Sequence, residues 1–200
     1  MNTSYITSAQ KAKQLPQFNL PEVAFIGRSN CGKSSLLNTL LERKNLARSS
    51  STPGRTQMIN FFSVSLSKGQ SMIFSDLPGY GFNVAAKEVR KHWDELMAAY
   101  LQRADLCELV YLIDVRRKFE DFEFLYMAEL AKNIPLLVVL TKIDKVKKKE
   151  VQEKKRYVEK TLKDKEIAYK DIFPISNLKK TGISKLRDLI FQHMTALIDQ

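Results

Sequence analysis

The feature that most constrains this chain is the octapeptide G-R-S-N-C-G-K-S, which directly follows an apolar run at 23–26. The pattern G-x-x-x-x-G-K-S after a strand is typical of a phosphate-binding loop, because its glycines let backbone N–H groups turn toward a polyphosphate. In such a loop we expect Lys33 to reach the β- and γ-phosphates and the Ser34 hydroxyl to ligate Mg²⁺. The positive end of the following helix adds to the site. The candidate phosphate-binding residues are Gly27, Arg28, Ser29, Asn30, Cys31, Gly32, Lys33 and Ser34.

Length and composition favour one globular domain, since the chain has 200 residues and 44% of them are hydrophobic. No stretch approaches the roughly 18 apolar residues of a membrane helix, and the N-terminus lacks a signal-peptide pattern, so we expect a cytoplasmic protein. Cys31 and Cys107 show neither metal-site nor disulfide-framework spacing, which predicts reduced thiols. The formal charge of +11 favours a polyanionic partner such as RNA or a ribosome, with a solvated charged surface as the alternative.

Apolar runs alternate with helical patterns, which predicts an α/β fold with a mostly parallel sheet and helices on both faces. We expect six strands, near 22–27, 59–66, 71–76, 108–114, 136–140 and 171–175. We expect helices near 33–41, 86–103, 119–133, 148–163 and 182–199. A turn at 67–70 makes a hairpin and therefore one antiparallel edge strand. Residues 1–20 are expected to form an N-terminal extension, and 21–200 a single domain.

A second motif, D-x-x-G, comprises Asp76, Leu77, Pro78 and Gly79 at the end of an expected strand. A carboxylate at this position can hold Mg²⁺ through water, while the glycine N–H meets the γ-phosphate. The loop that follows can therefore sense whether that phosphate is present.

The third motif has the form T-K-x-D and comprises Thr141, Lys142, Ile143 and Asp144, directly after an apolar run. A carboxylate accepts hydrogen bonds from N1–H and the exocyclic amine of guanine, and adenine lacks both donors at those places, so Asp144 is expected to select guanine. The stem of Lys142 can cover the ring. The commoner form begins with Asn, and the single hydroxyl of Thr141 predicts weaker bracing. Backbone N–H groups of Ile175, Ser176 and Asn177 can complete the base pocket.

Between the first two motifs, residues 44–57 are polar, small and without periodicity, which predicts a mobile segment. A threonine here can add a second protein hydroxyl to Mg²⁺ when the γ-phosphate is bound. Thr56 lies just before an expected strand and is better placed for this than Thr52. A flexible linker is the alternative.

Together the phosphate loop, the segment R-K-N-L-A-R-S-S-S-T-P-G-R-T-Q, the run D-L-P-G-Y-G-F and T-K-I-D resemble the EngB (YihA/YsxC) family of bacterial Era-like GTPases, over nearly the whole chain. The resemblance implies a P-loop GTPase fold, Mg²⁺-dependent binding and hydrolysis of GTP to GDP, a role in assembling the large ribosomal subunit, and a role in cell division and septation. It implies contacts with rRNA and ribosomal proteins, and we expect a monomer. Besides the residues above, it adds five nucleotide contacts: Gly54, Arg55, Thr56, Gln57 and Met58.

No catalytic glutamine is apparent, because Tyr80 follows the D-x-x-G motif. The intrinsic rate of hydrolysis should therefore be slow, about 10⁻⁴ s⁻¹, as in unassisted switch GTPases. Gln57 is a candidate for positioning water, and the catalytic residue is left open. Asn30 precedes C-G-K-S, an arrangement that in some Era-like GTPases coordinates K⁺; a structural cap of the loop explains it equally well.

Two other functions stay open. A P-loop nucleotide kinase shares the phosphate loop, but T-K-x-D and the absence of an obvious arginine-rich lid oppose it. A nucleic-acid-binding adaptor with structural nucleotide agrees with the basic charge. The densest basic tract spans 145–156 and includes Lys147, Lys148 and Lys149 at the start of an expected helix, where cations oppose the helix dipole. This tract is expected either to contact phosphates or to form a solvated helix face.

Overall fold

The structure is a computed structural model, and it describes residues 1–43, 58–66, 69–80 and 87–198. The helices are α1 (Lys33–Leu40), α2 (Lys87–Leu101), α3 (Asp121–Leu130), α4 (Lys148–Asp164) and α5 (Ile183–Ile198), with short 3-10 turns at Ala12–Gln14 and Ile143–Lys145. The strands are β1 (Asn2–Ala9), β2 (Glu22–Gly27), β3 (Ile59–Ser65), β4 (Ser71–Asp76), β5 (Leu106–Asp114), β6 (Leu136–Thr141) and β7 (Tyr169–Pro174).

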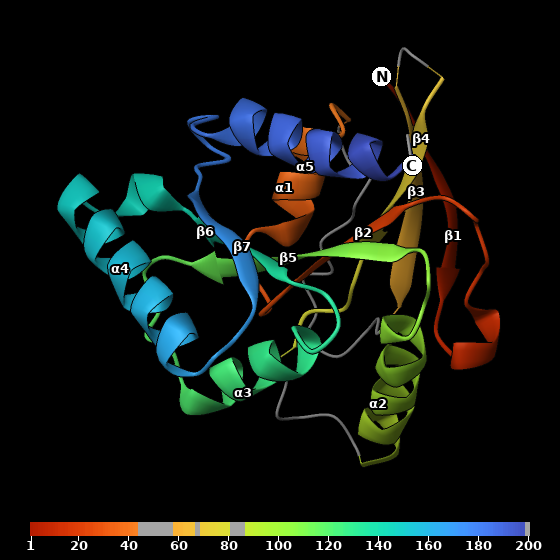
Figure 1. Cartoon of the computed structure of the whole chain (residues 1–200), viewed down its shortest axis with the longest axis horizontal. Helices are drawn as coiled ribbons and strands as arrows, with labels where there is room; N and C mark the ends of the chain where they lie inside the picture. Colours follow the sequence, from red (N-terminus) through yellow and green to blue (C-terminus); the bar gives the residue numbers. More distant parts are fainter. Residues whose placement is uncertain (44–57, 67–68, 81–86, 199–200) are drawn as a thin grey trace.

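These strands form one sheet in the order β1-β3-β4-β2-β5-β6-β7 (Figure 1). Strands β4, β2, β5, β6 and β7 run parallel to one another, whereas β3 is antiparallel to both β1 and β4. The expected α/β fold and mostly parallel sheet are confirmed. Because parallel strands end at the same side of a sheet, the segments that follow β2, β4, β5, β6 and β7 meet along one edge.

The expected number of six strands is wrong, because the described chain forms seven. The additional strand, β1, lies within residues 1–20 and pairs with β3 from Asn2↔Ser65 to Ala9↔Ile59. The antiparallel strand β3 is therefore internal, and β1 and β7 are the two edges of the sheet. The boundary between an extension and a domain at residue 20 stays a prediction.

Both faces of the sheet are covered by helices, as expected. Side chains of β2 alternate between two apolar layers, because successive residues of a strand point to opposite faces. Val23 and Phe25 pack in the layer that α1 and α5 complete, and Ala24 and Ile26 pack in the layer shared with α2, α3 and α4. Figure 1 shows α1 and α5 on one side of the sheet and α2 and α3 on the other. Within the described residues, no helix combines the length and apolarity needed to cross a membrane.

Candidate functional site

The phosphate loop connects the end of β2 to the start of α1. The loop needs glycine at Gly27, because a Cβ atom there would lie 2.7 Å from both the Cys31 sulfur and the Leu112 carbonyl oxygen. Gly32 caps α1 with φ +98°, a left-handed conformation that glycine adopts without strain. The Cys31 side chain is turned into the core, and burial raises the pKa of its thiol to about 11, so the thiol stays protonated.

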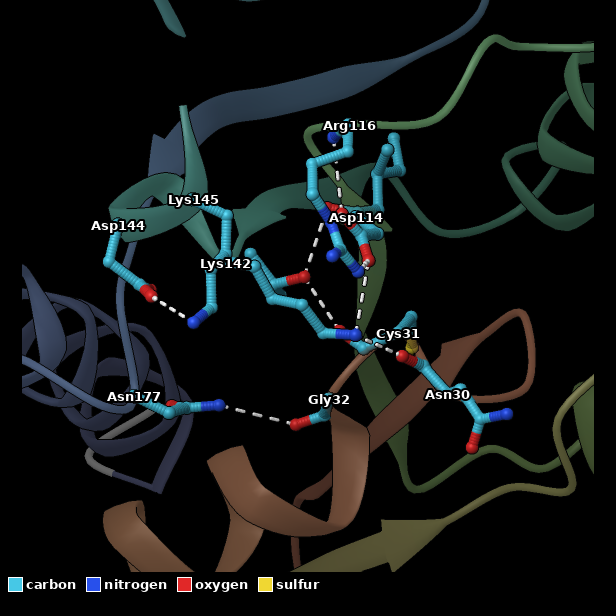
Figure 2. A network of polar contacts seen from close by, with 11 residues as sticks. Asn30, Cys31, Gly32, Asp114, Arg116, Lys142, Asp144, Lys145 and Asn177 are labelled. Carbon is cyan, nitrogen blue, oxygen red and sulfur yellow. Dashed lines mark hydrogen bonds and ion pairs between the residues drawn. The ribbon is translucent and has the colours of Figure 1, made fainter. Parts of the chain in front are cut away.

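Three consecutive carbonyl groups of this loop accept hydrogen bonds from side chains at or just beyond the ends of β6 and β7. The bonds run from Lys142 Nζ to Asn30 O (2.5 Å), from Thr141 Oγ1 to Cys31 O (2.6 Å) and from Asn177 Nδ2 to Gly32 O (3.3 Å). Figure 2 shows the Lys142 and Asn177 contacts. The C=O and N–H groups of a planar trans peptide point in opposite directions. The braces therefore turn the N–H groups of Gly32 and Lys33 away from β6 and β7, toward the side where a phosphate would lie.

Thr141 stands where the commoner form of the motif has asparagine, and its hydroxyl braces the loop. The Thr141 residue is fully buried, and its Oγ1 lies 2.6 Å from Cys31 O and 3.2 Å from Ile113 O. A hydroxyl has one proton to donate, whereas an amide has two. The shorter distance assigns the proton to the phosphate loop, and the two carbonyls cannot both be fully served.

The base-reading candidate Asp144 lies in the short 3-10 turn after β6. Its Oδ1 accepts a hydrogen bond from Ser176 Oγ at 2.6 Å, and its Oδ2 lies 3.7 Å from Lys145 Nζ (Figure 2 shows the Lys145 contact). The Ser176 hydrogen bond lowers the pKa of Asp144, so this group is an ionised acceptor at neutral pH.

In the segment 175–177, the expectation that backbone N–H groups face the base is wrong for Ile175 and Ser176. The N–H of Ile175 donates to Leu140 O at 2.8 Å, and the N–H of Ser176 donates to Thr181 O at 3.0 Å. Both amides are used to extend the sheet and close a turn. The side chains of Ser176 and Asn177 hold Asp144 and the phosphate loop, and a contact of the Asn177 N–H with the base stays a prediction.

The D-x-x-G segment packs directly against the phosphate loop. Asp76 is 4% exposed at the end of β4, and its Oδ1 forms an ion pair with Lys33 Nζ. Gly79 lies close to Ser29, because a Cβ atom there would lie 3.2 Å from the Ser29 backbone nitrogen, which is tighter than ordinary packing. The Ser29 N–H donates to Tyr80 O at 3.3 Å. The lysine and carboxylate of the first two motifs are thus in contact.

The remaining candidates are less informative. Leu77 is buried and its N–H donates to Phe25 O at 3.0 Å, and Pro78, which follows it, is also buried. Met58 immediately precedes β3. Four predicted contacts lie outside the described residues: Gly54, Arg55, Thr56 and Gln57.

Asp114 and Arg116 lie near the site and were not among the sequence candidates. Asp114 ends β5 and is in register with Thr141 of β6. Its carboxylate accepts hydrogen bonds from Arg116 Nε at 2.9 Å and Arg116 Nη2 at 2.6 Å, and it lies 3.1 Å from Lys142 Nζ (Figure 2). The signal in the sequence was a carboxylate that closes an apolar run, at the strand edge where the other motifs meet.

Charge balance around Asp114 keeps it ionised. Burial alone would raise the pKa of Asp114, but the hydrogen bonds from Arg116 and Lys142 outweigh burial and lower the pKa to about 2.

A cavity of about 410 Å³ lies beside the phosphate loop, between that loop, the end of β5 and the start of α3. Its wall includes Asp114, Arg116 and Lys142. The side chains of Lys33 and Asp144 do not line it. The cavity therefore shares residues 28–31 of the phosphate loop and Lys142 with the motifs, and it extends from them toward β5 and α3.

Comparison with known proteins agrees with this arrangement. Residues 22–142 match the family model described as 50S ribosome-binding GTPase. A probable GTP-binding protein EngB from Citrifermentans bemidjiense is 42% identical over 200 residues, which cover 98% of this chain and 87% of that protein.

Two solved structures share the fold. The crystal structure of a point variant of Aquifex aeolicus Era bound to GDP·AlF4⁻ is 26% identical with a TM-score of 0.73, and the match covers 88% of this chain and 57% of Era. The crystal structure of a probable GTP-binding protein EngB is also 26% identical, with a TM-score of 0.62, and the match covers 88% of this chain and 99% of that one. From its sequence relatives, its family model and its fold, this chain belongs to the EngB family of P-loop GTP-binding proteins.

Proposed function

We propose that this EngB-family protein binds GTP and GDP at the carboxyl edge of its sheet, hydrolyses GTP slowly, and acts as a molecular switch in assembly of the large ribosomal subunit. The observation that carries the proposal is the triple brace on the phosphate loop. Thr141 and Lys142 of T-K-x-D, together with Asn177, contact three carbonyl groups of the loop G-x-x-x-x-G-K-S, so the proposed base site and the proposed phosphate site are joined. Such joining couples recognition of the two ends of one nucleotide.

In this proposal, the N–H groups of the loop and the start of the α1 dipole hold the phosphates. Lys33 exchanges its partner Asp76 for phosphate oxygens when the nucleotide binds. Before the nucleotide binds, the Asp76 carboxylate neutralises the charge of the partly buried Lys33 ammonium. This pairing lowers the free-energy cost of keeping the lysine out of water beside the loop.

Magnesium is part of the proposal, and the donor set agrees with it. The hydroxyls of Ser34, in the first turn of α1, and of Thr56 would ligate Mg²⁺ directly, and the Asp76 carboxylate at the end of β4 would hold the ion through water. When bound, the ion supplies positive charge against the β- and γ-phosphates.

Guanine selection is assigned to Asp144. The Ser176 hydrogen bond uses one lone pair of Oδ1 and favours the ionised form, so the carboxylate keeps acceptor sites for the two donors of guanine. The stem of Lys142 lies over the ring plane in this proposal, because its Nζ is anchored on the Asn30 carbonyl.

Slow hydrolysis is supported by the surroundings of Tyr80. This residue takes the place where other GTPases carry a glutamine, and it is only 8% exposed. Its hydroxyl bonds with the Tyr111 hydroxyl and lies 3.4 Å from Glu123 Oε1. A side chain engaged in this way does not orient water, so acceleration must come from a partner or a cation.

The ribosomal role is supported by the name of the matched family, 50S ribosome-binding GTPase, and by the formal charge of +11. A switch in this process would act in the cytoplasm and would affect growth, division and septation through the supply of large subunits.

Turnover of GTP, measured alone and with purified large ribosomal subunits, tests the proposal. We expect slow turnover alone and a severalfold higher rate with large subunits, and no transfer of phosphate to a nucleoside monophosphate. Equal turnover with and without subunits, together with equal ribosome binding in GTP and GDP, would refute the switch.

A further inference from the structure

We infer that Asp114 is a positioning residue for nucleotide binding: held by Arg116, it fixes the Lys142 side chain in the orientation that covers the base. This inference rests on the role proposed above for Lys142. The three side chains form a continuous chain of contacts at the ends of β5 and β6 (Figure 2).

The backbone brings the two partners together. Asp114 and Thr141 are in register at the ends of neighbouring parallel strands, and the Val115 N–H donates to Thr141 O at 3.1 Å. Lys142 follows with φ +59°, a left-handed conformation that turns the chain sharply at this point. The lysine side chain therefore starts beside the Asp114 carboxylate.

The Lys142 ammonium has two acceptors, which together define its position. Nζ donates to Asn30 O at 2.5 Å and lies 3.1 Å from Asp114 Oδ2. A lysine has a flexible stem and loses substantial rotamer freedom when it is held in one place. Two acceptors from two different elements hold it before the nucleotide arrives, so less ordering remains to oppose binding.

Arg116 determines how Asp114 acts. Its guanidinium meets the carboxylate with Nε on Oδ1 and Nη2 on Oδ2, and the Arg116 backbone N–H adds a third bond to Oδ1 at 3.1 Å. A two-pronged contact of this kind fixes the plane of a carboxylate. Because the carboxylate is already paired, it orients Lys142 without drawing the lysine away from Asn30.

The test compares Asp114→Asn in two backgrounds, wild type and Lys142→Met. Methionine keeps an apolar stem over the base but removes the ammonium. The binding of N-methylanthraniloyl-GDP and its dissociation rate are measured for all four proteins. We expect Asp114→Asn to raise Kd about tenfold in the wild type, mainly through faster dissociation, and to change it less than twofold in Lys142→Met. A purely structural role would produce the same factor in both backgrounds and would overturn the inference, as would an unchanged Kd in the wild type.

Glu108→Gln is the matched control. Glu108 is another buried, ion-paired carboxylate of β5, held by Lys170 at 3.0 Å and His193 at 2.9 Å, but it lies near the opposite end of the strand. We expect this variant to lose stability and to keep the wild-type Kd. If the wild-type protein does not bind guanine nucleotides in the same assay, the proposed function itself is refuted. If it binds GDP normally and the Asp114 variant binds equally well, only the role of Asp114 is refuted.

Discussion

Replacing Thr141 by valine removes the hydroxyl that braces the phosphate loop while keeping the shape of the side chain. The Thr141 residue is fully buried and Cys31 is 3% exposed, so water cannot easily replace the lost donor at the Cys31 carbonyl. Leaving a buried acceptor without its partner costs about 1–3 kcal/mol. The same bond orients the Cys31–Gly32 peptide, whose N–H faces the proposed phosphate site.

We expect two effects of Thr141→Val. The melting temperature should fall, by roughly 2–4 °C per kcal/mol lost in a domain of this size. The Kd for GDP should rise about tenfold, which corresponds to about 1.4 kcal/mol, because the Gly32 N–H is no longer held in the orientation that meets phosphate. Differential scanning fluorimetry and isothermal titration calorimetry with GDP measure the two quantities.

Thr141→Ser is the control, because serine keeps the hydroxyl and loses only a methyl group. This loss costs about 0.8 kcal/mol or somewhat more in stability. The serine variant should therefore melt at a lower temperature but bind GDP with nearly wild-type affinity. If the valine and serine variants bind GDP equally well, the hydroxyl does not orient the loop and the bracing argument fails.

Three further perturbations test the base, the cation and the basic tract, and a fourth tests acid stability. Asp144→Asn should weaken GTP binding and strengthen XTP binding, because an amide donor would meet the donors of guanine but can donate to the carbonyl of xanthine. Competition binding with GTP, XTP and ATP measures this change. If the variant keeps the wild-type preference for GTP, Asp144 does not contact the base. If Asn30 helps hold a potassium ion, turnover should be faster in KCl than in NaCl at equal ionic strength, and Asn30→Ala should abolish the difference; a wild type without potassium preference excludes the ion. The triple alanine variant of the exposed Lys147, Lys148 and Lys149 should bind large subunits with a weaker dependence on salt. The slope of log affinity against log salt concentration should become shallower by up to about three. An unchanged slope would mean that the three lysines form a solvated helix face. The pKa of Asp114 is about 2 in the folded protein and about 3.9 in the unfolded chain, so the ionised carboxylate stabilises the fold above pH about 4, and this stabilisation is lost as pH falls toward 2. The acid unfolding profile of Asp114→Asn should lack this part of the pH dependence. Identical profiles for the variant and the wild type would contradict the argument.

Much of the site could be predicted from local sequence. Strands β2 and β4 begin and end at the predicted residues, and β6 ends within one residue of the prediction, because buried strands of a parallel sheet read as continuous apolar runs. Each of the three motifs follows such a run. Since parallel strands share a carboxyl edge, the order of runs and motifs along the chain already implied that the motifs converge.

The tertiary structure alone decided the features that depend on contacts distant in sequence. Strand β1 has only two buried residues, Thr3 and Ala9, and is held mainly by backbone hydrogen bonds to β3, so it carries no apolar alternation that a sequence could show. The use of the Ile175 and Ser176 amides inside the protein likewise depends on where Leu140 and Thr181 lie.

The contact between Asp114 and Lys142 has the same origin. Helix α3 separates the two residues along the chain, and only the register of β5 with β6 places the carboxylate beside the ammonium. A local pattern can mark a residue as the end of a strand, because strand ends follow from neighbouring residues. Which side chain it then meets is set by the packing of the whole sheet, and that information is not contained in any short segment of the sequence.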